Sequence, residues 1–182
     1  KTVAITGANR GIGLALAQEY LAAGYKVIGI CRKSSKALAE SGAKIIEGVD
    51  VTSANTLLHL KNKIKVHLGE ERLSLLINNA GILRAESITE LHKPSIEEQI
   101  KVNAIAPLRV TEALLSVIDD HGTLAFITSR MGSIEDNSSG GYYGYRMSKA
   151  ALNAGVKSLA VDLRARGTVV AIIHPGFVQT DM

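Results

Sequence analysis

The sequence predicts an α/β protein whose doubly wound parallel sheet lies between two layers of helices, α/β/α. Two observations carry this prediction. Short apolar runs rich in β-branched residues alternate with longer segments of helical periodicity along the whole chain. The first apolar run also leads directly into a glycine-rich turn that opens a helix. We expect about six strands, in the order 3-2-1-4-5-6, within one domain that spans residues 1–182.

The composition is that of a globular protein and argues against several classes. Of the 182 residues, 46% are hydrophobic and 21% are charged, which suits one domain with a sizeable core. Only 4% are aromatic and the net charge of +4 is scattered, so we expect no nucleic-acid partner. No apolar run is long enough to span a membrane. The single cysteine, Cys31, favours a reducing, cytoplasmic location. We expect no metal site.

The first half of the chain contains four predicted strands. Residues 1–6 are apolar and β-branched, which is typical of a buried strand. The helix that follows shows its apolar positions up to Leu21 and stops at Gly24. Ser53 is a candidate cap for a later helix. The remaining elements are a strand at 26–31, a short helix at 34–41, a strand at 43–49, a helix at 54–68 and a strand at 73–77.

Three glycines follow the first strand in the pattern G-x-x-x-G-x-G. Gly7 permits a tight turn, Gly11 lets the backbone approach a pyrophosphate, and Gly13 lets the helix pack closely on the strand. A pyrophosphate would lie at the helix N-terminus, where unpaired N–H groups and the helix dipole favour anions. The pattern therefore indicates a dinucleotide site, although its spacing differs from G-x-G-x-x-G and a purely structural turn is the alternative.

The second strand ends in basic residues. In a dinucleotide-binding fold this end reaches the adenosine ribose, where a carboxylate selects NAD and an arginine accommodates the 2′-phosphate of NADP. Here Arg32 and Lys33 follow the strand, and Arg10 lies in the glycine turn. We therefore expect NADP(H) in preference to NAD(H); the alternative is that these side chains are simply solvated.

The second half continues the alternation. Asn78-Asn79-Ala80-Gly81 ends the fourth strand and forms a polar floor where such sheets bind ligands. Pro107 lies within a helix predicted from Pro94 or Ser95 to about Ile118. It removes the hydrogen bond to the carbonyl of Asn103, so we expect a kink there. The remaining elements are a strand at 123–128 that ends in Ser129, a loop at 133–141, a helix from the Tyr145 region to about Arg166 and a strand at 168–173.

Tyr145 and Lys149 stand four residues apart, so a helix places them on one face. An ammonium beside a phenol favours the phenolate and lowers the pKa of the tyrosine. A tyrosine tuned in this way can exchange a proton with a carbonyl or an alcohol. An exposed ion-dipole pair on an ordinary helix is the alternative for such a spacing taken alone.

Taken together, these motifs resemble the short-chain dehydrogenase/reductase family, and the segments around Ser129 and Tyr145 resemble its Sniffer and C-factor branch of carbonyl reductases. The resemblance covers essentially the whole chain and implies an NAD(P)-binding Rossmann fold. It implies that Tyr145 is the general acid/base, that Lys149 lowers its pKa and holds the nicotinamide ribose, and that Ser129 bonds the substrate carbonyl. The Asn103 main chain would hold a water that relays protons.

The resemblance also implies a cofactor site. Asp50 would bond the adenine, Val51 would lie beside the ring, and Val178 and Thr180 would anchor the carboxamide. The full predicted set is Gly7, Asn9, Arg10, Gly11, Ile12, Gly13, Arg32, Asp50, Val51, Asn79, Ala80, Gly81, Tyr145, Lys149, Pro175, Gly176, Val178 and Thr180.

Two departures from the family pattern matter. Ser129 and Tyr145 are a few residues further apart than usual, which leaves Ser133 as a second candidate for the catalytic serine. The family pattern also places a substrate-binding loop, a helix and a last strand after the Pro-Gly motif, and we expect these to be missing after Met182.

The sequence thus predicts an NADPH-dependent reductase of a ketone, aldehyde or quinone. A non-catalytic NADP(H)-binding regulatory or signalling module is the first alternative, and dehydratase or epimerase chemistry is the second. A homodimer or homotetramer, paired through the long helices, is expected.

Overall fold

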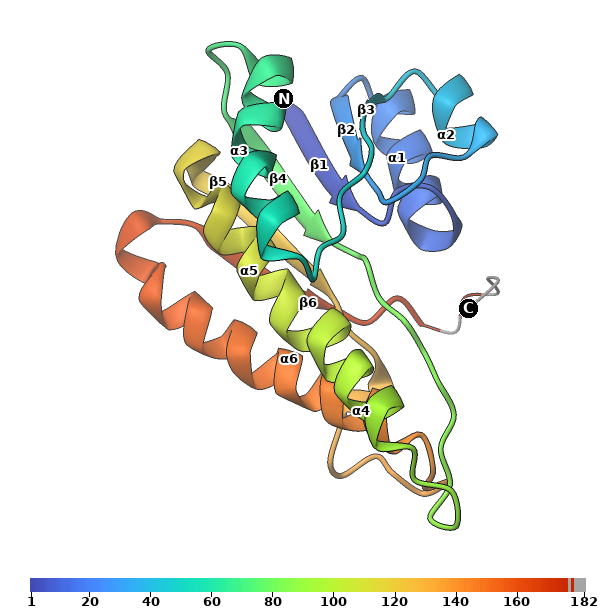
Figure 1. The fold of residues 1–182 in the computed structure, drawn as a ribbon. Coiled ribbons are helices and arrows are strands. Elements are labelled where there is room, and N and C mark those ends of the chain that lie inside the picture. The colour runs from blue at the N-terminus through green and yellow to red at the C-terminus, as the bar shows by residue number, and fades with distance from the viewer. Residues whose placement is uncertain (177, 179–182) are drawn as a thin grey trace.

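The structure, a computed structural model, describes residues 1–176 and residue 178. Within these residues six parallel strands form one sheet in the order β3-β2-β1-β4-β5-β6, as predicted (Figure 1). The order reverses between β1 and β4, which creates a crevice at the carboxyl ends of these two strands. The strands are β1 (Thr2–Thr6), β2 (Lys26–Ile30), β3 (Lys44–Ile46), β4 (Leu73–Asn78), β5 (Ile118–Ile127) and β6 (Val169–Ile173).

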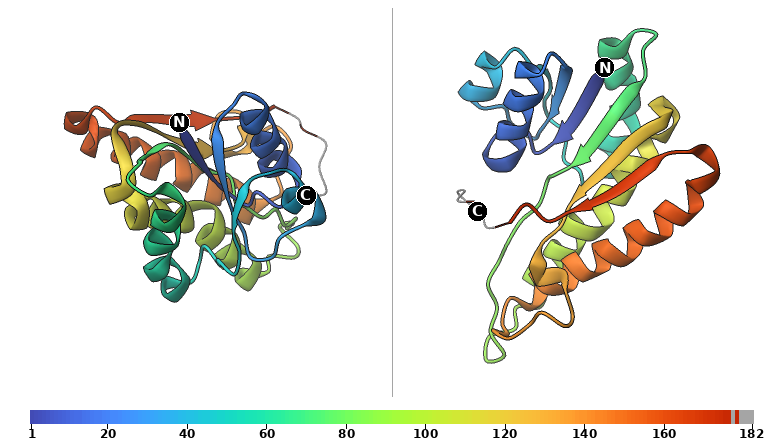
Figure 2. Two further views of the ribbon diagram at one scale, coloured as in Figure 1. Left: turned by 90° about the horizontal axis from the view of Figure 1, so that it is seen from above. Right: turned by 180° about the vertical axis from the view of Figure 1, so that it is seen from behind.

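Helices cover both faces of the sheet, as the two views of Figure 2 show. One core cluster, which includes Leu60, Phe126 and Val156, packs the sheet against α3, α5 and α6; a second, which includes Ile5 and Ala17, packs it against α1 and α2. The central strands are buried on both faces, which explains their continuous apolar runs. On the second face α1 and α2 leave the β6 end of the sheet open, and Ile173 is 42% exposed there. The helices are α1 (Gly11–Ala22), α2 (Lys36–Glu40), α3 (Ala54–Leu68), α4 (Lys93–Ile100), α5 (Ala106–Leu114) and α6 (Tyr143–Asp162).

Ser53 occupies the N-cap position of α3, but its side chain makes no capping hydrogen bond, so the predicted cap is wrong. The preceding turn is held by the carboxylate of Asp50 instead. This carboxylate accepts hydrogen bonds from Thr52 N at 2.9 Å and Thr52 Oγ1 at 2.8 Å. An aspartate that binds the backbone two residues on is a common turn device.

The helix predicted from Pro94 or Ser95 to about Ile118 is interrupted. A π-helical turn, η1 (Lys101–Ile105), separates α4 from α5, and Pro107 follows in the first turn of α5. A proline cannot donate to the carbonyl of Asn103 and its ring crowds that carbonyl, so a wider turn accommodates it. The interruption agrees with the prediction, and its form is a π-helical bulge.

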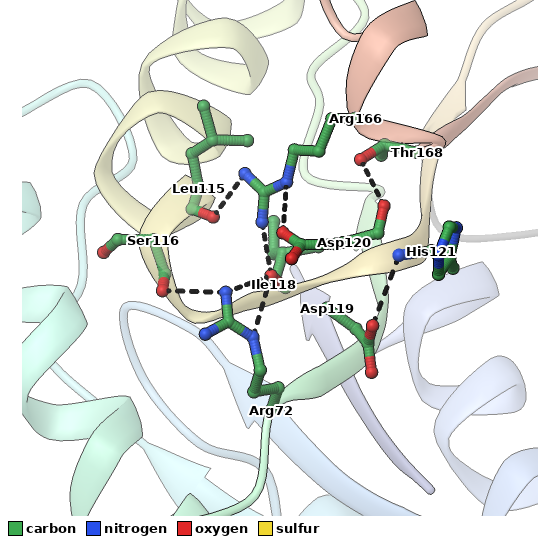
Figure 3. Close-up of polar contacts among 9 residues, drawn as sticks. All are labelled: Arg72, Leu115, Ser116, Ile118, Asp119, Asp120, His121, Arg166 and Thr168. Atoms are coloured by element: carbon green, nitrogen blue, oxygen red, sulfur yellow. Dashed lines mark hydrogen bonds and ion pairs between the residues drawn. The ribbon is translucent and has the colours of Figure 1, made fainter.

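The predicted end of this helix and the predicted start of the next strand are wrong. A 3₁₀ turn, η2 (Leu115–Val117), follows α5, and β5 already begins at Ile118. Arg72 and Arg166 both donate to the carbonyl of Ile118, at 2.8 and 2.5 Å (Figure 3). They also reach the carbonyls of Ser116 and Leu115, which the end of the helix leaves unpaired. These distant arginines fix the boundary, and the local pattern does not reveal them.

No helix in the described part of the chain combines the length and the apolar character needed to cross a bilayer.

Candidate active site

A cleft of about 420 Å³ opens at the carboxyl ends of the central strands. Its walls come from the glycine turn after β1, the ends of β2, β4 and β5, and the start of α6. Of the predicted site residues, those that line it are Gly7, Asn9, Arg10, Gly11, Ile12, Arg32, Asp50, Val51, Asn79, Ala80, Gly81, Ser129, Tyr145, Lys149, Pro175, Gly176 and Val178.

Two residues of the predicted set that the structure describes do not line the cleft. Gly13 and Asn103 are buried behind its walls. Thr180 lies outside the described residues. Ser133, the second candidate for the catalytic serine, is exposed and its hydroxyl accepts a hydrogen bond from Asp136 N at 3.1 Å. Because Ser129 lines the cleft and Ser133 does not, the geometry favours Ser129.

The floor of the cleft depends on close backbone contact between the glycine turn and α1. A Cβ on Gly13 would lie 2.3 Å from the carbonyl oxygen of Gly7, and Gly7 itself has a φ of +67°. Asn79 Nδ2 ties the end of β4 to the same turn by donating to Thr6 O at 3.0 Å and Gly7 O at 3.3 Å. Only glycine fits at both turn positions.

The N-terminus of α1 suits an anion. Arg10 stands at the N-cap, its side chain makes no capping hydrogen bond, and the first turn contains no acidic residue. The first amides of α1 therefore remain available as donors, and the helix dipole favours negative charge there. Gly11, with a φ of +53°, keeps side-chain atoms away from this end. The donor set fits the pyrophosphate of a dinucleotide.

Arg32 and Asp50 stand at the far end of the cleft, after β2 and β3. The pKa of Asp50 is lowered mainly by the hydrogen bond from the Thr52 amide, and the charge of Arg32 contributes further. Asp50 is therefore an anion at neutral pH and can accept a hydrogen bond from an adenine amino group. Arg32 places a positive charge at this end of the cleft.

The opposite end of the cleft carries the predicted catalytic side chains. Tyr145 is 9% exposed and Lys149 is 5% exposed, on successive turns of α6. Lys149 Nζ donates to Ile127 O at 2.9 Å and lies 5.7 Å from the centre of the Tyr145 ring. Ser129 opens the 3₁₀ turn η3 (Arg130–Gly132), with its hydroxyl accepting from Met131 N at 3.1 Å.

The pKa of Tyr145 shifts in the direction opposite to the one predicted. Burial raises it above the ordinary value, and a hydrogen bond with Ser129 only partly offsets this rise. Burial also lowers the pKa of Lys149 to about 8. The Lys149 ammonium donates its hydrogen bond to the main-chain carbonyl of Ile127. Burial disfavours the charged form of each side chain, which raises the pKa of Tyr145 and lowers the pKa of Lys149.

Asn103 lies in η1, and its buried side chain makes three hydrogen bonds. Oδ1 accepts from Ile82 N at 2.8 Å, and Nδ2 donates to Ile82 O at 2.8 Å and to Ser148 Oγ at 3.0 Å. Ser148 Oγ in turn donates to Tyr145 O at 2.8 Å. Asn103 therefore connects the segment after β4 with the turn of α6 that carries Tyr145.

Sequence reasoning missed several residues. Thr6 Oγ1 accepts from Asn79 N at 3.0 Å and Ala80 N at 3.1 Å, and so shapes the polar floor. Ser148 and Glu86 are buried polar residues without a motif of their own. The signal that could have identified them is their burial, which only the fold reveals. Cleft residues that were not singled out are Ile30, Cys31, Val49, Thr52, Ile82, Leu83, Arg84, Glu98, Val102, Ile127, Thr128, Met131 and His174.

The chain matches, over residues 1–182, the family model described as short chain dehydrogenase. It is 34% identical to 1-hydroxy-2-glutathionyl-2-methyl-3-butene dehydrogenase of Rhodococcus sp. (strain AD45), over 100% of this chain and 79% of that protein. It is 44% identical to C-signal of Myxococcus xanthus, over 60% of this chain and 68% of that protein.

Solved structures show the same likeness. Carbonyl reductase Sniffer of D. melanogaster superposes with a TM-score of 0.92 at 31% identity, covering 100% of this chain and 82% of that one. An NADPH-bound carbonyl reductase from chicken fatty liver gives a TM-score of 0.90 at 32% identity, covering 100% and 81%.

The strand order, the glycine turn and the cleft at the reversal point define a Rossmann-type nicotinamide-binding protein. More narrowly, the chain belongs to the short-chain dehydrogenase/reductase family and is an NAD(P)-dependent oxidoreductase of its Sniffer-like branch.

Proposed function

We propose that the protein reduces the carbonyl of a ketone, aldehyde or quinone to an alcohol with NADPH. The observation that carries the proposal is a buried tyrosine, Tyr145, that lines the cleft together with Ser129, while arginines line the end of the cleft after β2. The carbonyl reductases among the similar structures, one of them titled as NADPH-bound, support it.

The chain's own residues would supply binding and proton transfer. When bound, the nicotinamide supplies a hydride to the carbonyl carbon. Ser129 would hydrogen-bond the carbonyl oxygen, and the Tyr145 hydroxyl would give its proton to that oxygen as negative charge develops. Because burial raises its pKa, Tyr145 keeps this proton at neutral pH. Lys149 adds positive charge beside the reacting oxygen while the pH is below about 8.

The direct test is product analysis with purified protein, NADPH and a small panel of diketones, quinones and aldehydes. We expect one alcohol formed for each NADPH oxidised. An NADPH complex that converts none of these carbonyls would contradict the proposal and favour the regulatory module, for which the likeness to C-signal gives a motive. A dehydrated or epimerised product would favour the second alternative.

Preference for NADPH is the second part of the proposal. Arg10 and Arg32 line the cleft, and no carboxylate follows β2 directly. Arg32→Asp should raise the KM for NADPH at least about tenfold and leave the KM for NADH nearly unchanged, because the aspartate repels a 2′-phosphate. Lys33→Asp is the matched control, since Lys33 does not line the cleft. Equal effects of both variants would contradict a phosphate contact at Arg32.

We also propose that the protein assembles as a dimer or tetramer through the helices around α4, α5 and α6. Support comes from exposed apolar side chains on these helices: Ile105 is 52% exposed, Met147 50% and Val161 51%. Light scattering should give a mass at least twice that of the chain, and a monomer at all concentrations would contradict this proposal.

A further inference from the structure

We infer that Glu86 is a positioning residue that, together with Gln99, fixes the N-terminal turn of α6 and so the place of Tyr145 in the cleft. The inference rests on the proposed function for its kinetic readout. Glu86 lies in the segment between β4 and α4 and is only 7% exposed, which is unusual for a carboxylate. It does not line the cleft.

The Glu86 carboxylate is fully used as a hydrogen-bond acceptor. Oε1 accepts from Gln99 Nε2 at 2.6 Å and from Ser95 Oγ at 2.7 Å, both on α4. Oε2 accepts from Gly144 N at 3.1 Å, in the first turn of α6. The carboxylate therefore bridges two helices and caps the second one, where the helix dipole stabilises negative charge.

The orientation of the Gln99 amide requires a hydrogen-bond acceptor on the side chain of residue 86. Its Oε1 accepts from Arg84 N at 2.8 Å, so its amino group must point to Glu86. Gln99 is 0% exposed, so bulk solvent cannot take either role. A side-chain amide at position 86 would place an NH₂ group against this NH₂ group, or remove the acceptor for Gly144 N.

The first turn of α6 is fitted closely to this network. A Cβ on Gly144 would lie 2.5 Å from Gln99 Nε2 and 2.9 Å from the Cα of Ile96. Tyr142, just before the helix, has a φ of 53°, a left-handed conformation that costs a non-glycine residue roughly 1 kcal/mol or more. Its amide donates to Glu86 O at 2.9 Å, so the same residue holds the strained entry to the helix.

Tyr145 directly follows Gly144, so a shift of this turn moves the phenol. Proton transfer needs the hydroxyl within hydrogen-bond reach of the substrate oxygen, and a misplacement of about 1 Å can cost about a hundredfold in rate. Glu86 itself touches neither the cleft nor Tyr145's hydroxyl, and it acts through the backbone that carries the tyrosine.

The test exchanges the two side chains. Glu86→Gln should lower kcat at least about tenfold while NADPH affinity, measured by fluorescence, stays near that of the unmodified protein. In the double variant Glu86→Gln/Gln99→Glu, the amide oxygen at position 86 accepts from Gly144 N and its NH₂ group donates to the carboxylate at position 99. The Ser95 hydroxyl changes from donor to acceptor, and most of the lost kcat should be recovered. The matched control is Glu97→Gln, which removes an exposed carboxylate from α4, the helix that carries Gln99. It should leave kcat unchanged.

A Glu86→Gln protein with full kcat would overturn the inference, and so would a folded double variant with no recovery. A fall of kcat, NADPH affinity and melting temperature together would show a merely structural role and would also overturn it. If Glu86→Gln does not fold, Gly144→Ala decides, because its methyl group meets Gln99 Nε2 and the Cα of Ile96 and so pushes the same turn away from α4. Full kcat in Gly144→Ala would then contradict the inference.

Hydrogen exchange separates this inference from the proposed function. Amides of residues 143–149 should exchange faster in Glu86→Gln and return toward the original rate in the double variant, whether or not any carbonyl is reduced. If the unmodified protein turns over no carbonyl, the proposed function fails and the exchange rates still test Glu86. Unchanged exchange in Glu86→Gln would overturn the inference.

Discussion

Lys149 is a buried cation whose position is costly. It is 5% exposed and burial lowers its pKa from 10.5 to about 8. The hydrogen bond to the carbonyl of Ile127 compensates for only part of the lost hydration. A side chain held at such a cost in a cleft is a candidate for function rather than for stability.

This cost predicts how stability depends on pH. Between about pH 8 and 10.5 the unfolded chain holds the Lys149 proton and the folded chain has lost it, so the free energy of unfolding rises with pH. From neutral pH to pH 10, this residue should contribute a gain of roughly 2 kcal/mol. Denaturant titrations should show that gain for the unmodified protein relative to Lys149→Met.

The control for that series is Lys157→Met, which changes an exposed lysine on the same helix. If the unmodified protein and Lys149→Met keep a constant difference in stability over this pH range, the lowered pKa of Lys149 is wrong.

The same two pKa shifts predict the pH dependence of the reaction. In the proposed mechanism, reduction needs the protonated Tyr145 and the Lys149 cation, so its kcat should decline as the pH rises above about 8. Alcohol oxidation needs the phenolate, so its rate should rise over the same range. Parallel pH profiles in the two directions would contradict this assignment.

At the scale of elements, the strand–turn–helix unit at the N-terminus sets the cofactor end of the cleft. Gly13→Ala places a methyl group 2.3 Å from the Gly7 carbonyl, a backbone atom that cannot move without displacing the turn. We expect NADPH affinity to fall at least about tenfold, because the amides of α1 lose their position. Fluorescence titration with NADPH would measure it.

Gly155→Ala is the matched control, since it too adds a methyl group to a helix. That methyl group meets Leu108 Cδ1 at 2.9 Å, and a terminal side-chain atom can move aside. Equal loss of NADPH affinity in the two variants would contradict the role given to Gly13.

Elements whose cause is local could be predicted from the sequence, and those fixed by distant contacts could not. The glycine turn and the helical periodicity of α3 and α6 predicted the positions of these elements close to those in the structure. The start of β5 was misplaced because Arg72 and Arg166, far away in the sequence, bind its first carbonyl. The polar stretch at 119–122 therefore looks like a loop although it belongs to β5.

For the whole molecule, the two edges of the sheet serve different purposes. The cleft occupies the carboxyl edge, while Arg72 and Arg166 join α5, β5 and the end of α6 at the opposite edge (Figure 3). Arg166→Ala removes the hydrogen bonds that this arginine donates to the Leu115 carbonyl, the Ile118 carbonyl and the Asp120 carboxylate. The Ile118 carbonyl keeps its hydrogen bond from Arg72. The protein should lose about 1–3 kcal/mol of unfolding free energy.

NADPH affinity should be unchanged in Arg166→Ala, because the cofactor cleft is at the other edge. Arg164→Ala, an exposed arginine in the same turn, should cost less than about 0.5 kcal/mol. Thermal and denaturant unfolding measure both, and comparable losses would contradict the structural role of Arg166.

In the candidate site too, some residues could be predicted from sequence motifs and others only from the fold. Ser129, Tyr145 and the glycine turn could be found from the sequence because each belongs to a motif next to a strand end. Glu86 and Gln99 could not, because they lie in unremarkable polar segments and gain meaning only when the fold buries them beside α6. The direction of the Tyr145 pKa shift was misjudged because burial, which the spacing of two residues does not reveal, raises it by more than the Ser129 hydrogen bond lowers it.

The most direct test of the central claim is NADPH oxidation with a carbonyl substrate by the unmodified protein, by Tyr145→Phe and by Tyr143→Phe. Each variant removes one phenolic hydroxyl from the first turn of α6, and of the two tyrosines only Tyr145 lines the cleft. We predict that Tyr145→Phe lowers kcat by about 10²-fold or more, with NADPH still bound, and that Tyr143→Phe keeps it. Full turnover in Tyr145→Phe would contradict the account.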